Sequence, residues 1–186
     1  MIINLRGTSG SGKSTVVFNL LDKLKSVKPI SLDIPIDKHP HAYQLKLPNS
    51  KPLFIVGPYH VQSGGCDRLG TNNMVMRVVD QLALRGSVLF EGRMISFAYG
   101  AVGEWSKKYG DDFVFAFLDT PLTVCLERIQ ARRRAHGNNR PLNPFRTEEG
   151  FKNNWKVFPK LQQQGRRVVM IDHKRATKQI LDLLIQ

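Results

Sequence analysis

Several features that would place this chain in another class of protein are absent. Its 186 residues include 2 cysteines, Cys66 and Cys125, which lie far apart and form no Cys-x-x-Cys pair. Such spacing indicates neither a structural zinc site nor a disulfide framework. No apolar run has transmembrane length, and residues 1–12 lack the apolar core of a signal peptide. We therefore expect a single globular domain over residues 1–186 that works in the cytoplasm.

Acidic residues are also scarce. The chain has 15 Asp and Glu against 28 Lys and Arg, a formal net charge of +13. The excess is concentrated in residues 128–186, and the stretch 128–146 contains six arginines and no acid. This balance predicts an anionic partner larger than one nucleotide, for which nucleic acid is the obvious candidate. The alternative to nucleic-acid binding is that the basic surface keeps the protein soluble and that the arginines contact only ATP.

A phosphate-binding loop is present near the N-terminus. Residues 7–14 complete the pattern Gly-x-x-x-x-Gly-Lys-Ser between an apolar run at 2–5 and helical apolar spacing at 16–24. This strand–turn–helix context is the one in which the pattern binds a nucleoside triphosphate. Glycines let backbone N–H groups surround the phosphates at a helix N-terminus, and Lys13 is expected to reach the β- and γ-phosphates. The expected nucleotide-binding residues are Gly7, Thr8, Ser9, Gly10, Ser11, Gly12, Lys13, Ser14 and Thr15.

Strand and helix patterns alternate along the rest of the chain. Apolar runs typical of strands lie at 52–56, 87–90, 113–118 and 167–171, and helical patterns at about 74–82, 95–108, 147–164 and 176–185. A further helix is expected to begin at Thr120-Pro121, to continue through Arg134 and to break at Gly137. The segments 42–47 and 52–56 are expected to form a hairpin or two strands joined by a loop. The alternation predicts a three-layer α/β/α fold around a mostly parallel five-stranded sheet.

Residues that follow the predicted strands are candidates for the site, because ligands of such sheets lie beyond the carboxyl ends of the strands. Glu91 follows 87–90 and is expected, with Ser14, to hold Mg²⁺. Arg93 is placed to contact a phosphate or the acceptor. Asp67 ends a Gly-Gly-Cys turn and is a candidate to take the proton of an acceptor hydroxyl.

Each acid also has a structural interpretation. Glu91 could be an acid that the dipole at a helix N-terminus stabilises, and Asp67 could be an ordinary turn residue. Asp33 and Asp37, in a segment interrupted by prolines, are weaker candidates for the general base. The sequence leaves the choice among Asp67, Asp33 and Glu91 open, and it does not fix the oligomeric state.

The arginine-rich stretch is expected to be a lid over the triphosphate, around residues 128–146. Arg128 and Arg132 lie on one face of the predicted helix and are expected to neutralise charge on the transferred group. A solvated basic helix is the alternative. The aromatic side chains that follow are expected mainly to be the buried face of a helix, with base stacking as the alternative. They are Phe145, Phe151, Trp155 and Phe158.

These motifs together resemble those of known kinases. The loop at 7–15, the arginine-rich stretch and the order of elements are similar to the P-loop nucleotide kinases, which include thymidylate kinase and polynucleotide kinase. The segments 6–15, 64–67 and 88–92 more specifically resemble a group of bacteriophage kinases that includes the 5-hydroxymethyluracil DNA kinases. Asn4-Leu5-Arg6 replaces the Phe-Glu-Gly that precedes the loop in thymidylate kinases, which argues against that enzyme.

The resemblance implies an activity. It implies an ATP- and Mg²⁺-dependent kinase that phosphorylates the hydroxymethyl group of 5-hydroxymethyluracil in phage DNA, a step in thymidine hypermodification. Because chemistry on a base requires it to leave the stack, single-stranded or locally opened DNA is the expected substrate. A kinase for a free nucleotide or nucleoside, and an ATP-dependent nucleic-acid-binding protein, remain as alternatives.

Overall fold

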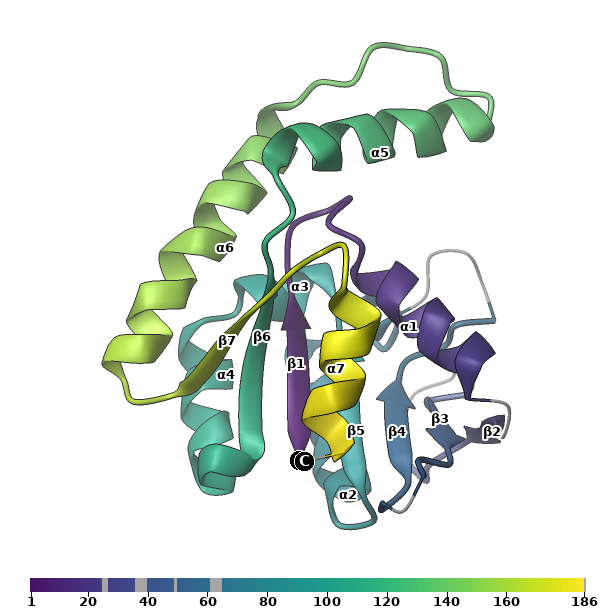
Figure 1. The fold of residues 1–186 in the computed structure, drawn as a ribbon, viewed down its shortest axis with the longest axis vertical. Helices are drawn as coiled ribbons and strands as arrows, with labels where there is room; N and C mark the ends of the chain where they lie inside the picture. The colour runs from purple at the N-terminus through teal and green to yellow at the C-terminus, as the bar shows by residue number, and fades with distance from the viewer. Residues whose placement is uncertain (25–26, 36–39, 49, 61–64, 186) are drawn as a thin grey trace.

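The central layer of the molecule is a seven-stranded sheet with the order β2-β3-β4-β5-β1-β6-β7 (Figure 1). The computed structural model describes residues 1–24, 27–35, 40–48, 50–60 and 65–185. Strands β4, β5, β1, β6 and β7 run parallel, and β3 pairs antiparallel with both β2 and β4. The strands are β1 (Ile2–Arg6), β2 (Val27–Ile30), β3 (Ala42–Leu45), β4 (Leu53–Val56), β5 (Ser87–Glu91), β6 (Phe113–Leu118) and β7 (Arg167–Ile171).

The predicted α/β class is confirmed, but the predicted number of strands is wrong. Five strands make the parallel part, and the β2–β3 hairpin extends it at one edge. Strand β2 contains Pro29, which lacks an N–H and is tolerated there because β2 lies at the edge of the sheet. The expected hairpin between 42–47 and 52–56 is confirmed by the antiparallel β3–β4 pairing.

Both faces of the sheet are buried, which explains why the strands read as continuous apolar runs. In β6, for example, Phe113, Phe115 and Phe117 belong to one core cluster, and Val114 and Leu118 belong to the other. Helices α1 (Lys13–Lys23) and α7 (Ala176–Ile185) cover the second face. Helices α2 (Asn72–Ala83), α3 (Arg93–Phe97), α4 (Gly100–Ser106) and α6 (Phe145–Gln163) cover the first (Figure 1).

The single helix expected over 95–108 is wrong, because two helices, α3 and α4, occupy this stretch. Ala98 has an extended backbone conformation and ends α3. The carbonyl groups near this end are not lost to solvent, since the buried guanidinium of Arg6 donates hydrogen bonds to those of Ile95, Ser96 and Ala98 at 3.1 to 3.3 Å. Burial lowers the pKa of Arg6 to about 9. The cation at the end of β1 therefore fixes the break in the helix.

Helix α5 (Leu122–Ala135) lies across the carboxyl ends of the strands, and the chain then returns along it to α6 (Figure 1). The aromatic residues of α6 divide into two groups. Trp155 and Phe158 pack against Phe117 of the core, as expected for a buried face, whereas Phe145 is 59% exposed. Within the described part of the chain, no helix combines the length and apolarity needed to cross a membrane. Two 3₁₀ helices, η1 (Cys66–Arg68) and η2 (Lys107–Asp112), complete the fold.

Candidate active site

The loop between β1 and α1 is shaped by glycines whose backbones no other residue adopts easily. Gly10 has φ 78° and Gly12 has φ 102°, both in the left-handed region. A Cβ on Gly10 would also lie 2.3 Å from the carbonyl oxygen of Cys125 in α5. Gly12 precedes α1 without a side-chain cap, so the first N–H groups of this helix remain available to an anion.

Lys13 begins α1 and points back into the loop. Its Nζ donates hydrogen bonds to the carbonyl oxygens of Gly7 at 2.7 Å and Thr8 at 3.1 Å. Burial lowers the pKa of Lys13, and the nearby carboxylates of Glu91 and Asp67 oppose that shift. Among the described residues, the positive charge held in the loop is thus hydrogen-bonded to backbone carbonyls alone.

Glu91 ends β5 beside this loop, and 3% of it is exposed. Its Oε1 accepts two hydrogen bonds, from the Ser14 hydroxyl at 2.9 Å and the Tyr59 hydroxyl at 3.0 Å. Burial raises the pKa of Glu91, while Lys13 and these two hydrogen bonds lower it in part. The arrangement places a carboxylate and a serine hydroxyl next to each other at the N-terminus of α1.

Asp67 lies in η1 and binds the start of α3. Its Oδ2 accepts the backbone N–H of Arg93 at 2.7 Å, and its Oδ1 accepts that of Met94 at 2.9 Å. The approach is close, since a Cβ on Gly92 would lie 2.9 Å from Oδ1 of Asp67. Asp67 therefore stabilises the start of α3, as its structural interpretation predicts. Its carboxylate is nevertheless exposed and keeps lone pairs that accept no hydrogen bond from these two groups.

Helices α5 and α6 are both attached to the phosphate-binding loop. Nη1 of Arg128 donates to the carbonyl oxygens of Gly10 at 3.4 Å and Ser11 at 3.2 Å. The Thr120 hydroxyl, just before α5, also donates to the Ser11 carbonyl at 2.7 Å. On the other side, the Thr8 hydroxyl donates to a carbonyl in the first turn of α6, that of Thr147, at 3.4 Å. The arginine-rich segment is thus anchored at both ends on the loop.

A cavity of about 670 Å³ brings most of the predicted site residues together. Asp33 is exposed after β2 and does not line the cavity. Asp37 and Gly64 lie outside the described residues. The loop residues that do not line the cavity are Gly7, Thr8 and Ser11. The lining residues are Ser9, Gly10, Gly12, Lys13, Ser14, Thr15, Asp67, Arg68, Glu91, Arg93, Arg128 and Arg132.

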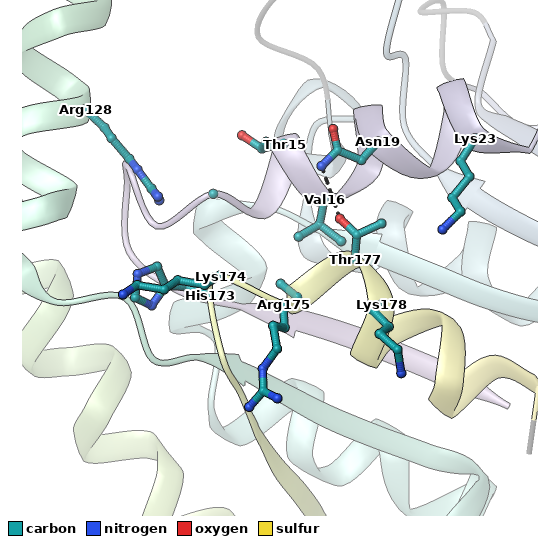
Figure 2. Close-up of a pocket in the computed structure, with 12 residues that line it drawn as sticks. Thr15, Val16, Asn19, Lys23, Arg128, His173, Lys174, Arg175, Thr177 and Lys178 are labelled. Atoms are coloured by element: carbon teal, nitrogen blue, oxygen red, sulfur yellow. Dashed lines mark hydrogen bonds between the residues drawn. The ribbon is translucent and has the colours of Figure 1, made fainter.

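A second cavity, of about 540 Å³, adjoins the first and shares Gly12, Thr15 and Arg128 with it. It lies between α1 and the connection from β7 to α7. Figure 2 shows side chains of both elements around it, with Asn19 of α1 hydrogen-bonded to Thr177 of α7 at 3.2 Å. Its remaining lining residues are Val16, Asn19, Lys23, His173, Lys174, Arg175, Ala176, Thr177 and Lys178.

His173 is oriented within this second cavity by Asp119, whose Oδ1 accepts its backbone N–H at 2.7 Å and lies 3.0 Å from its Nδ1. Asp119 directly follows β6, so this contact connects the carboxyl ends of β6 and β7.

Tyr59 and the segment 173–178 were not among the predicted site residues, although their positions along the chain provided a signal. Tyr59 follows β4, and His173 follows β7, so both satisfy the rule that site residues come after the strands. Tyr59 is not recognisable as a partner of Glu91, because no local pattern connects residues from two different strand ends.

The hydrogen bond from Tyr59 leads to a prediction on pH dependence. Its hydroxyl stabilises the Glu91 carboxylate, so Tyr59→Phe should raise the pKa of Glu91. If activity requires the carboxylate, the acidic limb of the pH–rate profile should move to higher pH while the alkaline limb stays in place. Tyr43→Phe is the matched control, because Tyr43 packs near Tyr59 with its hydroxyl 3.4 Å from His60. Identical acidic limbs in Tyr59→Phe and the unsubstituted chain would contradict the prediction.

Comparison with known proteins identifies relatives along nearly the whole chain. The chain is 35% identical over 185 residues to a "5-hmdU DNA kinase" of Pseudomonas phage PaMx11, covering 98% of this chain and 96% of the relative. It is 32% identical over 187 residues to a "5-hmdU DNA kinase" of Pseudomonas phage M6, covering 96% and 94%. No protein-family model matches the chain. The resemblance to the phage kinases inferred from the sequence motifs is confirmed.

Among solved structures, the chain is similar to a gluconokinase from Sinorhizobium meliloti 1021. The TM-score is 0.49 and the identity 14%, over 98% of this chain and 90% of the other. A similarity of this extent tells nothing further about the site.

Proposed function

Because this chain belongs to the family of 5-hmdU DNA kinases, we propose that it transfers the γ-phosphoryl group of ATP to the hydroxymethyl group of 5-hydroxymethyluracil in DNA. The observation that carries the proposal is the 670 Å³ cavity, which places a lysine, two carboxylates and several arginines around the phosphate-binding loop. This is the combination that phosphoryl transfer requires, namely donors for the phosphates and an acid–base group for the acceptor.

The donor nucleotide would span the two cavities. Its phosphates would lie on the backbone N–H groups at the start of α1, with Lys13 turning from the loop carbonyls to the β- and γ-phosphates. Its nucleoside would extend into the second cavity, which continues past Gly12 and Arg128. If the nucleoside pointed the other way, it would lie in the larger cavity. Asp67 and Glu91 would repel the α-phosphate there, and the nucleoside would occupy the space that the acceptor needs.

Ser14 and Glu91 fit a magnesium site. They offer a hydroxyl and a carboxylate 2.9 Å apart beside the position of the phosphates, and oxygen donors of this kind are those that Mg²⁺ prefers. When bound, the metal would neutralise part of the charge on the β- and γ-phosphates. The role of Tyr59 is then to hold the Glu91 side chain in position.

In the transfer step, the hydroxymethyl oxygen of the base attacks the γ-phosphorus. The new O–P bond forms as the bond between the γ-phosphorus and the β–γ bridging oxygen breaks, and ADP leaves. The hydroxyl proton passes to Asp67, whose carboxylate is held in place by the N–H groups of Arg93 and Met94. The side chains of Arg93, Arg128 and Arg132 line the same cavity and would stabilise the charge on the transferred group.

The arginine-rich segment 128–146 would act as the lid of this site. Its two ends are attached to the loop through Arg128 and Thr147, so a movement of the part between them would close over the triphosphate and exclude water. The acceptor base must leave the helical stack to reach the cavity, which favours single-stranded or locally opened DNA. ATP and replicating phage DNA meet in the host cytoplasm, where we propose that the protein acts.

The proposal is tested with γ-labelled ATP and matched acceptors. We expect label in a 5-hydroxymethyluracil oligonucleotide, more when it is single-stranded, and none in the same oligonucleotide with thymine, which lacks the acceptor hydroxyl. All oligonucleotides carry a 5′-phosphate, so that their terminal hydroxyl cannot accept the label. Transfer to free 5-hydroxymethyl-deoxyuridine monophosphate without transfer to the polymer would overturn the proposal in favour of a small-molecule kinase.

A further inference from the structure

We propose that Phe145, together with Arg133 and Arg146, forms a second DNA-binding site outside the catalytic cavity, which holds a nucleotide adjacent to the target in single-stranded DNA. The inference rests on the proposed function in one respect, that the acceptor is a DNA strand. It adds where that strand runs and which side chain stacks on a neighbouring base.

The exposure of Phe145 is the first observation. Phe145 is 59% exposed at the start of α6, although two aromatic residues further along the same helix, Trp155 and Phe158, pack on Phe117. An aromatic ring left in water at a position where the helix could have placed a polar residue is a candidate for contact with another molecule.

The surroundings of this ring are the second observation. A cavity of about 370 Å³ lies beside it, lined by Arg133, Pro141, Leu142, Asn143, Phe145 and Arg146. The cavity combines an aromatic ring and two apolar side chains with two guanidinium groups, and no acid lines it. A nucleotide has the complementary pair of features, a flat base for the ring and a phosphate for the arginines.

The segment that carries this cavity is held in place by its own hydrogen bonds. Nη1 of Arg133 donates to the Pro141 carbonyl at 3.5 Å, and Nη2 donates to Oδ1 of Asn138 at 3.4 Å. Oδ1 of Asn143 accepts the backbone N–H of Phe145 at 3.0 Å. Arg133 therefore ties the returning segment to α5, so that Phe145 and the arginines of α5 would move together as one part of the lid.

The position relative to the catalytic cavity fits one continuous strand. Arg132 lines the catalytic cavity and Arg133, its neighbour on α5, lines the cavity at Phe145. Consecutive residues of a helix project about 100° apart, so α5 presents cations to both cavities at the same height. A strand whose target base enters the catalytic cavity would thus pass across α5 to the ring. The stretch 128–146 contains no acid that would repel its phosphates.

The test measures binding of unmodified, single-stranded oligonucleotides by fluorescence anisotropy, without ATP. We expect Phe145→Ala to weaken binding about ten-fold, and Phe145→Trp to retain it, because stacking depends on the ring and not on a specific base. Leu84→Ala is the matched control, since Leu84 is 90% exposed at the end of α2, away from both cavities. Arg146→Gln should reduce the slope of log affinity against log salt by about 0.7, the value for one phosphate of a single strand.

A scan with single abasic sites makes the test specific for stacking. At one position of the oligonucleotide, loss of the base should weaken binding to the unsubstituted chain but not to Phe145→Ala. Equal losses in both proteins at every position would overturn the inference, as would a change in sedimentation showing that Phe145 only joins two copies of the chain. The binding test does not depend on phosphoryl transfer, so the two proposals fail separately. If the kinase proposal were wrong, DNA would still bind at Phe145, but the experiment with γ-labelled ATP would show no transfer.

Discussion

Replacement of Lys13 by alanine should lower kcat for phosphoryl transfer by about 100-fold or more, the range found when one electrostatic donor is removed from an active site. Lys13 is the cation at the N-terminus of α1, and its ammonium contacts the carbonyls of Gly7 and Thr8. No other lysine lines the catalytic cavity, within the part of the chain that the structure describes. The positive charge that Lys13 places beside the β- and γ-phosphates would therefore not be replaced by another lysine, and the arginines of the cavity are assigned to the transferred group.

The fold should survive this change. Lys13 is buried as a cation at a cost reflected in its lowered pKa, and its hydrogen bonds go only to backbone carbonyls. Thermal unfolding of Lys13→Ala should accordingly resemble that of the unsubstituted chain. Lys51→Ala is the control, because Lys51 is exposed just before β4, at the amino end of that strand and not at the carboxyl ends that carry the site. More than a tenth of the original activity in Lys13→Ala would contradict the assigned role.

Glu91→Gln is expected to have an effect of similar size, about 100-fold on the transfer rate, with a higher requirement for Mg²⁺. Glutamine retains the size of the side chain, and its carbonyl oxygen accepts the hydrogen bonds from Ser14 and Tyr59. The substitution thus removes the charge while leaving the packing in place. Titration of activity with Mg²⁺ at saturating ATP measures the shift.

Asp67→Asn is the informative partner of this experiment. Asparagine can still accept one N–H from the start of α3, so the turn should persist. We expect a lower rate at saturating Mg²⁺ and ATP, with unchanged ATP affinity, because Asp67 is assigned to the acceptor hydroxyl. If Asp67→Asn changed the Mg²⁺ requirement and Glu91→Gln did not, the two roles would have to be exchanged.

The strand, glycine-rich turn and helix over residues 2–23 and the core of the sheet could be predicted from the sequence, because they depend on neighbours along the chain. Strand, glycine-rich turn and helix follow one another within residues 2–23, and the structure places them as the pattern predicts. The position of Glu91 directly after a buried strand was sufficient to bring it to the carboxyl edge of the sheet. In such cases hydrogen bonding within a segment and the alternation of apolar residues determine the outcome locally.

Other features were decided by contacts between segments that are distant in the sequence. The hydrogen bonds of Tyr59 to Glu91 and of Asp67 to the start of α3 join separate strand ends. The break between α3 and α4 is fixed by Arg6, which lies some ninety residues earlier in the chain. Phe145 belongs to the same helix as the partly buried Trp155 and Phe158, but it is the first residue of α6 and is left exposed there. Sequence patterns specify which face of an element is apolar, but the packing of the elements decides which side chains meet there.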